Sequence, residues 1–319
     1  MRGRDLVLLL ALAALWSSSF LFIKVALAEL TPALIVLGRL AFGSLTLLAS
    51  IPLLQRMAPE LLPEGGGRGI LDGIRVRRGP LLFLGAFNAV LPFAAIAWGE
   101  NFISSGAASI FNSTVPLFTA LLVLALPFFP EEKPNALAIA GLLLGFVGVG
   151  VLVTGDPEGG GAASRTAQAL GGGAVLLGAL SYAVGNVYAR RRLKGTAVLV
   201  SAVGQNAAGI LVLLPLVFVS GLPEELPSFG VMGALFGLGA GGTGIAYLIY
   251  FGLISRVGAT KTSAVAYLMP AIALFYGAVF LGEEISLRAL LGLALILTGV
   301  AGVTGVLRLP ERFRRQPPS

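Results

Sequence analysis

Long apolar segments, separated by short clusters of Pro, Gly and charged residues, recur along the whole chain. A helix needs about 20 apolar residues to cross the hydrocarbon core of a bilayer, and backbone polar groups in lipid are satisfied only in helices or closed barrels. The pattern therefore predicts ten membrane-spanning helices. They cover residues 6–27, 33–54, 80–98, 106–127, 136–154, 171–189, 197–219, 229–252, 261–281 and 288–307.

Composition agrees with a membrane protein and argues against an enzyme. Of 319 residues, 56% are hydrophobic and 12% are charged, whereas about 25% of the residues in an average soluble domain are charged. The chain contains no His and no Cys, so it cannot build a Ser-His, Cys-His or typical zinc site. We expect neither a cofactor nor a metal ion. The first apolar segment begins like a signal peptide but continues to Leu27, which predicts an uncleaved span.

The distribution of Lys and Arg predicts an orientation, because cytoplasmic loops are rich in these residues. They gather in alternate loops, as at Arg75, Arg77 and Arg78 and again at 190–192. Placing both termini in the cytoplasm assigns nearly all of them to that side. We therefore expect a multi-pass protein of the cell (inner) membrane, and we ascribe the net charge of +7 to topology and not to nucleic-acid binding.

The two halves of the chain repeat each other. A shift of 166 residues takes Arg39 to Gln205, and later in each half a shift of 154 residues takes Pro116 to Pro270. Each repeat holds five spans, an odd number, so the second copy must lie inverted in the membrane. The predicted fold is an all-α membrane protein with ten transmembrane helices in two inverted five-helix repeats. Its domains are residues 1–154 for the first repeat, 155–170 for a linker, 171–307 for the second repeat and 308–319 for a cytoplasmic tail.

Polar and amphipathic residues near the centres of these spans are candidate ligands for a solute. Inverted repeats usually enclose a substrate site near the midplane, where the two repeats meet. Each candidate has a structural alternative, because small hydroxyls let helices pack closely and amides hydrogen-bond between helices. Helix kinks are expected at Pro92, Pro116 and Pro270. The candidate substrate-binding residues are Trp16, Ser19, Asn88, Ser109, Asn112, Tyr182, Asn186, Tyr247, Tyr250 and Tyr267.

Three ionisable residues lie within or at the edge of the predicted spans, where charge is costly. Lys24 lies near one end of its helix and can snorkel to the interface or form a structural ion pair. Arg39 lies about two turns inside its helix, and Glu100 is the acid that could meet it. Such a pair is either a structural lock or an outer gate. No Asp occurs in any predicted span, so the buried carboxylate relay of a proton pump is missing.

Several short motifs carry a family resemblance. They include Trp16-Ser-Ser-Ser-Phe20, Trp98-Gly-Glu100, Ser105-Gly-Ala-Ala-Ser109 and Tyr267-Leu-Met-Pro270. Over nearly the whole chain, the sequence resembles the EamA family of the drug/metabolite transporter superfamily. The resemblance implies an exporter or facilitator of small organic solutes such as amino acids, with a central cavity and with the fifth and tenth spans at the periphery.

The resulting prediction is a secondary transporter or uniporter that moves a small organic solute by alternating access, with efflux as the expected direction. A lipid flippase or scramblase on the same inverted scaffold is the alternative. The expected partners are a small-molecule substrate and the lipid bilayer. Gly141 and Gly145 form a GxxxG motif, which is typical of close helix packing within one chain or in a homodimer.

Overall fold

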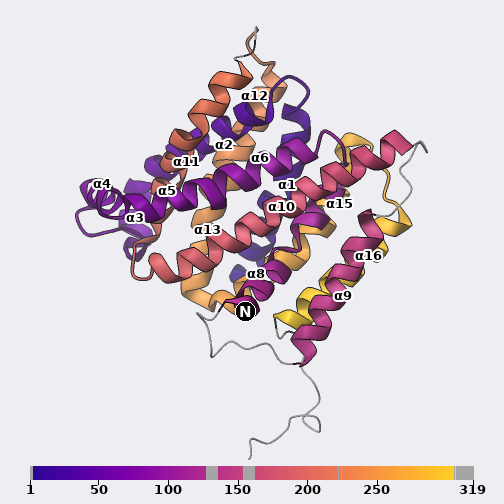
Figure 1. The fold of residues 1–319 in the computed structure, drawn as a ribbon. Coiled ribbons are helices and arrows are strands. Elements are labelled where there is room, and N and C mark those ends of the chain that lie inside the picture. The colour runs from indigo at the N-terminus through magenta and orange to yellow at the C-terminus, as the bar shows by residue number, and fades with distance from the viewer. Residues whose placement is uncertain are drawn as a thin grey trace, which may run out of the picture.

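The computed structural model describes residues 3–126, 136–153, 162–221, 223, 225–304 and 306, and these residues form helices and connecting turns without β-strands (Figure 1). The first part of the predicted linker, up to residue 161, and the predicted tail at 308–319 lie outside the described residues. Residues 162–170, which the sequence assigned to the linker, are the start of a long helix.

Each of the ten predicted spans coincides with a helix or a broken helix in the described part of the chain. In the first repeat these are α1 (Gly3–Ala26), α2 and α3 (Pro32–Ala49, Ile51–Met57), α5, η2 and α6 (Arg78–Leu84, Gly85–Val90, Leu91–Gly99), α7 and α8 (Ser105–Asn112, Val115–Ala125), and α9 (Ala136–Val153). In the second repeat they are α10 (Ala162–Arg192), α11 (Val198–Ser220), α12, η4 and α13 (Phe229–Phe236, Gly237–Ile245, Ala246–Val257), α14 and α15 (Ala259–Thr262, Val265–Leu281), and α16 (Leu287–Val303). The short helices η1 (Pro59–Leu61) and α4 (Gly66–Val76) lie between the second and third spans.

The surface of the helical bundle is apolar, as lipid requires. Within the described residues, eight helices are long and apolar enough to cross a membrane, and α15 and α16 are shorter apolar helices. Soluble proteins rarely expose large contiguous apolar patches. Here exposed apolar side chains occur on many helices, among them Leu10, Leu45, Leu143, Val147, Leu177, Phe218, Phe275 and Leu291.

Helix packing follows the inverted duplication. Helix α1 packs against α15, and its repeat counterpart α10 packs against α7 and α8. Helix α2 packs against η4, and its counterpart α11 packs against η2, while α2 and α11 contact each other. Nearly every contact between the repeats thus has its image on the other side of the bundle. The all-α fold with two inverted five-helix repeats is confirmed.

The fifth and tenth spans pack closely on each other at one edge of the bundle (Figure 1). A Cβ added at Gly141 would lie 2.6 Å from the carbonyl oxygen of Gly299, and one added at Gly148 would lie 2.9 Å from that of Gly292. Only glycine permits such an approach of two helix backbones. Within this chain, the glycine stripes of α9 and α16 therefore serve an intramolecular contact.

The loops at the two ends of the bundle are tied by separate polar contacts. At one end, which we call the Glu29 side, the Glu29 carboxylate accepts a hydrogen bond from the Ser228 N–H at 2.7 Å. This contact lowers the pKa of Glu29, through the side chain and backbone of Ser228. At the other end, the Asp5 side, Asp5 and Arg256 form an ion pair at 2.8 Å. The α1–α2 turn is thereby joined to the start of α12, and the start of α1 to the end of α13.

A third contact on the Glu29 side connects the fourth and ninth spans. The Glu283 carboxylate accepts hydrogen bonds from the N–H and hydroxyl of Ser105, at 2.7 and 2.8 Å, and from the Gly106 N–H at 3.2 Å. These N–H groups belong to the first turn of α7, where they have no intrahelical partner and where the helix dipole favours an anion. Glu283 therefore joins the loop after α15 to the start of α7.

We expect Glu283→Gln to destabilise the folded protein by about 1–3 kcal/mol, because it replaces charge-assisted hydrogen bonds at a helix N-terminus by weaker neutral ones. Thermal unfolding in detergent would measure the change. The neighbouring Glu284 is exposed, so Glu284→Gln is the matched control and should unfold as the wild type does. Equal unfolding temperatures for the two variants would contradict this role of Glu283.

Candidate functional site

Two π-helical segments lie at equivalent positions in the third span of each repeat. They are η2, residues 85–90, and η4, residues 237–245. Pro92, just after η2, cannot donate the N–H that an α-helix would direct to the carbonyl of Asn88 in η2, so the regular hydrogen-bond ladder is interrupted there. In η4 the sequence is rich in glycine. Such π segments are rare in proteins overall, but those that occur are often at functional sites. The third span of each repeat therefore has irregular backbone at the point where it meets the other repeat.

Two side-chain hydrogen bonds join the repeats at these segments. Arg39 on α2 donates from Nε to the Thr243 hydroxyl of η4 at 3.1 Å. On the opposite side, Asn88 of η2 donates from Nδ2 to Gln205 Oε1 of α11 at 2.9 Å. Arg39 and Gln205 are the pair that the 166-residue shift relates. Each repeat therefore reaches from its second helix to the π segment of the other repeat.

Aromatic side chains connect these two hydrogen bonds into one cluster of buried and half-buried residues. The Arg39 guanidinium lies over the Phe93 ring, 3.7 Å from its centroid, in a geometry that attracts a cation. Tyr182 packs against Phe93 in an edge-to-face arrangement, with ring centroids 6.1 Å apart. Tyr247 contacts the Gln205 side chain. We call Arg39, Asn88, Phe93, Tyr182, Gln205, Thr243 and Tyr247 the central cluster.

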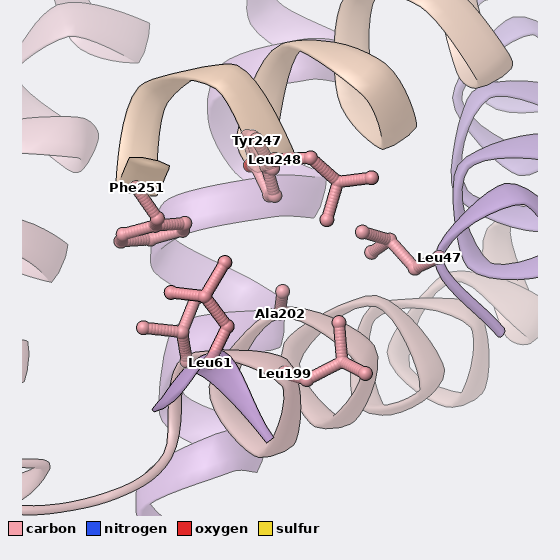
Figure 2. Close-up of a pocket in the computed structure, with 8 residues that line it drawn as sticks. Leu47, Leu61, Leu199, Ala202, Tyr247, Leu248 and Phe251 are labelled. Atoms are coloured by element: carbon pink, nitrogen blue, oxygen red, sulfur yellow. The ribbon is translucent and has the colours of Figure 1, made fainter. Parts of the chain in front are cut away.

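An apolar hollow lies beside the central cluster (Figure 2). Figure 2 shows Tyr247 and Phe251 of α13 on one wall, Leu199 and Ala202 of α11 on another, and Leu61 of η1 close to them. The hollow has no room for a water molecule in this conformation, whereas typical small-molecule sites measure roughly 300–1,000 Å³. The candidate site is therefore defined by the polar groups of the central cluster and not by this hollow.

Trp16, Ser19 and Tyr250 flank the central cluster on its α1 side. The rings of Trp16 and Tyr250 lie 5.2 Å apart, and Phe251 packs against both Tyr250 and Tyr247, with ring centroids 5.1 and 6.2 Å away. The Ser19 hydroxyl faces η4 so closely that a Cβ at Gly242 would lie 2.7 Å from it. The structure thus brings Trp16, Ser19, Asn88, Tyr182, Tyr247 and Tyr250 of the predicted residues to one region.

The other four predicted residues lie elsewhere. Ser109 and Asn112 lie on α7, and a buried oxygen of each has no hydrogen-bond partner among the described residues. The Tyr267 hydroxyl shares a hydrogen bond of 2.5 Å with Thr304 at the end of α16, so this residue ties α15 to α16. Asn186 is exposed on α10. No described contact places these four side chains in the central cluster.

The three prolines lie at different kinds of helix irregularity. Pro92 follows η2 at the start of α6, and Pro116 is near the start of α8, after a turn that separates it from α7. Pro270 lies inside α15 and is buried. The third and fourth spans are therefore broken next to a proline, whereas α15 continues through its own.

The three predicted charges do not form ion pairs with one another among the described residues. The Lys24 ammonium donates hydrogen bonds to the backbone carbonyls of Glu100 and Ile103. Arg39 has Thr243 and Phe93 as its close partners. The Glu100 side chain is fully buried, and neither carboxylate oxygen has a hydrogen-bond partner in the described part of the chain.

Gln205, Thr243 and Phe93 belong to the cluster but were not among the predicted site residues. Gln205 had a signal, because the repeat shift relates it to Arg39. Thr243 lies in a glycine-rich segment that resembles a nucleotide-binding motif. Because no strand precedes this segment, the sequence argued against nucleotide binding but predicted no other role for Thr243. Phe93 had no signal, because a phenylalanine in an apolar span is ordinary.

The comparisons with known proteins agree with this architecture. The EamA-like transporter family matches residues 4–154 and 169–305, which is most of the chain. The chain belongs to the EamA-like transporter family. This EamA-like protein is therefore a multi-pass membrane transporter, and the family points to transport rather than to enzymatic activity.

Relatives of this EamA-like transporter span nearly its full length. It is 27% identical to the uncharacterized inner membrane transporter YedA of Escherichia coli K12, over 93% of this chain and 89% of YedA. It is 24% identical to the uncharacterized transporter YoaV of Bacillus subtilis, over 92% of this chain and 94% of YoaV. A solved crystal structure matches with a TM-score of 0.60 and 20% identity, covering 99% of this chain and all of that one. This last likeness concerns the fold.

Proposed function

We propose that this EamA-like transporter is a secondary transporter or uniporter that moves a small organic solute, such as an amino acid or a related metabolite, out of the cell by alternating access. The observation that carries the proposal is the central cluster, a set of buried and half-buried polar side chains where both repeats meet. Burying polar groups in a membrane protein is costly, and transporters of inverted-repeat design bind their substrates near such a midplane crossing.

In the proposed cycle, two helix contacts that are equivalent in the two repeats, α2–η4 and α11–η2, close in alternation. In one state the α2–η4 crossing is tight and the α11–η2 crossing opens, and in the other state the roles are exchanged. The π segments support this exchange, because irregular backbone at a cavity can change its hydrogen bonding more easily than a regular helix. Rigid rocking of the repeats around a fixed central site would then expose the solute to each side in turn.

We also propose that both termini are cytoplasmic, so that the Asp5 side faces the cytoplasm. The Lys- and Arg-rich segments at residues 68–78 and 190–194 lie on this side, and the Arg77 guanidinium donates to the Arg192 carbonyl at 3.3 Å. Positive charge is retained in cytoplasmic loops, which supports the assignment.

Cysteine labelling would test the orientation, since the chain has no native Cys. Leu226 is 95% exposed in the loop that precedes Ser228 on the Glu29 side. Leu226→Cys should react with a membrane-impermeant maleimide on intact cells. Arg75→Cys, on α4 at the opposite side, should react only after permeabilisation. The reverse pattern would overturn the proposed orientation.

Solute counterflow would test the transport function. Purified protein in proteoliposomes, loaded with one unlabelled amino acid or organic acid, should accumulate the same labelled solute above the level of protein-free liposomes. The panel should be run beside an assay for translocation of a fluorescent phospholipid. Phospholipid translocation without counterflow of any solute would overturn the proposal and favour a lipid flippase or scramblase.

A further inference from the structure

The Arg39 guanidinium is a buried cation with few partners. The residue is 8% exposed and lies deep in α2. A guanidinium carries five N–H donors, and within the described part of the chain only Nε–H has an acceptor, the Thr243 hydroxyl. The face of the guanidinium is covered by Phe93. The planar edge that normally makes paired hydrogen bonds with an anion is left without a protein partner among the described residues.

No carboxylate of the described residues forms a salt bridge with this cation. Glu100 interacts with Arg39 only at longer range, and Glu283 is occupied by the first turn of α7. Asp5 pairs with Arg256 on the Asp5 side of the bundle. A buried guanidinium that lacks a carboxylate within salt-bridge distance is unfavourable, so the site is electrostatically prepared for an anion that comes from outside the protein.

The other half of the central cluster is polar but uncharged. At the position related to Arg39 by the repeat, the second repeat has the amide of Gln205, bonded to Asn88. The Asn88 Oδ1 atom is buried and has no hydrogen-bond partner among the described residues. A pseudo-symmetric site with a cation on one side and amides on the other distinguishes the two ends of a solute. The amide end suits a neutral or donor group such as an amine or hydroxyl.

We propose that Arg39 binds the carboxylate of the transported solute, so that this transporter selects small organic acids or amino acids whose second polar group faces Asn88 and Gln205. This inference rests on the proposed transport function and specifies its substrate class. Arg39 is then a binding residue, and Thr243 positions it by holding Nε. An arginine suits this role because its fork makes two parallel hydrogen bonds to a carboxylate.

Matched carboxylate and amide solutes would test the inference by counterflow. The probes are L-leucine, L-phenylalanine and succinate, each compared with L-leucinamide, L-phenylalaninamide and succinamide. The wild type should transport at least one carboxylate at least tenfold faster than its amide. Arg39→Gln should lower that transport at least tenfold and remove the preference, and Arg39→Lys should keep the preference with a higher KM. The exposed Arg75 supplies the control Arg75→Gln, which should behave as the wild type.

Each outcome decides between the inference and its failure. Equal transport of an acid and its amide by the wild type, or wild-type acid transport by Arg39→Gln, overturns the carboxylate role while the transport function stands. Absence of counterflow with every probe overturns the inference, and phospholipid translocation in the same liposomes would then overturn the transport function as well. If Arg39→Gln fails to insert, Thr243→Val decides: the KM for the carboxylate should rise several-fold with little change in kcat, and an unchanged KM counts against the inference.

Discussion

Alanine at Gly239 or Gly85 is expected to destabilise this EamA-like transporter by about 3 kcal/mol or more, at the upper end of the cost of overpacking. A Cβ at Gly239 would lie 2.9 Å from the Arg39 carbonyl oxygen and 3.1 Å from the Gly43 nitrogen. At the repeat-related position, a Cβ at Gly85 would lie 2.6 Å from the Gly209 nitrogen. The obstacles are backbone atoms of α2 and α11, so no side-chain rotation relieves the clash, and the helices must separate.

Glycines of the eighth span with open surroundings supply matched controls. A Cβ at Gly233 in α12, or at Gly252 in α13, would meet nothing within 4 Å. Gly233→Ala and Gly252→Ala should therefore be neutral or slightly stabilising, because alanine favours a helix over glycine. Thermal unfolding in detergent and size-exclusion profiles would measure all four variants. Unfolding temperatures of Gly239→Ala and Gly85→Ala within about 2 °C of their controls would contradict the close crossings.

The number of spans and the inverted duplication were predictable from the sequence, because both follow from sequence patterns that do not depend on how the helices pack. Apolar length identifies a span whatever its neighbours, and an odd number of spans in a repeat forces inversion. The same repeat shift related Arg39 to Gln205, which are equivalent in the central cluster. This part of the site was therefore accessible to sequence analysis.

The rotation of each helix was not predictable. In a soluble helix the polar face identifies solvent, but in a membrane both the lipid and the protein interior accept apolar residues. Tyr267 and Tyr247 look alike in sequence, yet Tyr267 bonds to Thr304 at the end of α16 and Tyr247 lies beside Gln205. The π segments were also hidden, because Gly and Pro weaken a regular helix without specifying what replaces it.

The partners of the three charges also depended on tertiary contacts. A lysine near a helix end can snorkel to the interface, yet Lys24 reaches backbone carbonyls of Glu100 and Ile103. Arg39 and Glu100 are the two buried charges that the sequence could pair, and the structure gives Arg39 the hydroxyl of Thr243 instead. Which partner a charged side chain reaches depends on differences of a few ångströms in the positions of neighbouring helices. The spacing of residues along the chain does not determine these positions.

Asn88→Leu is expected to abolish solute counterflow, lowering its rate more than tenfold, while leaving membrane insertion intact. The substitution keeps the number and branching of the side-chain heavy atoms and suits an apolar span, but it removes the Nδ2–H that Gln205 accepts. Gln205 is 6% exposed, and a buried acceptor that loses its donor costs about 1–3 kcal/mol. Asn101 is exposed and, among the described residues, its side chain donates to carbonyls of the preceding helix end, so Asn101→Leu is the control and should transport normally.

A double substitution would separate a structural role of this hydrogen bond from a role in solute binding. Replacing both partners of a buried hydrogen bond by apolar groups is often nearly neutral, so Asn88→Leu combined with Gln205→Leu should regain much of the stability lost by Asn88→Leu alone. If the amides only tie η2 to α11, transport should return together with stability. We expect stability to return without transport, because the solute then lacks its polar partners in the second repeat; recovery of both would remove Asn88 and Gln205 from the site.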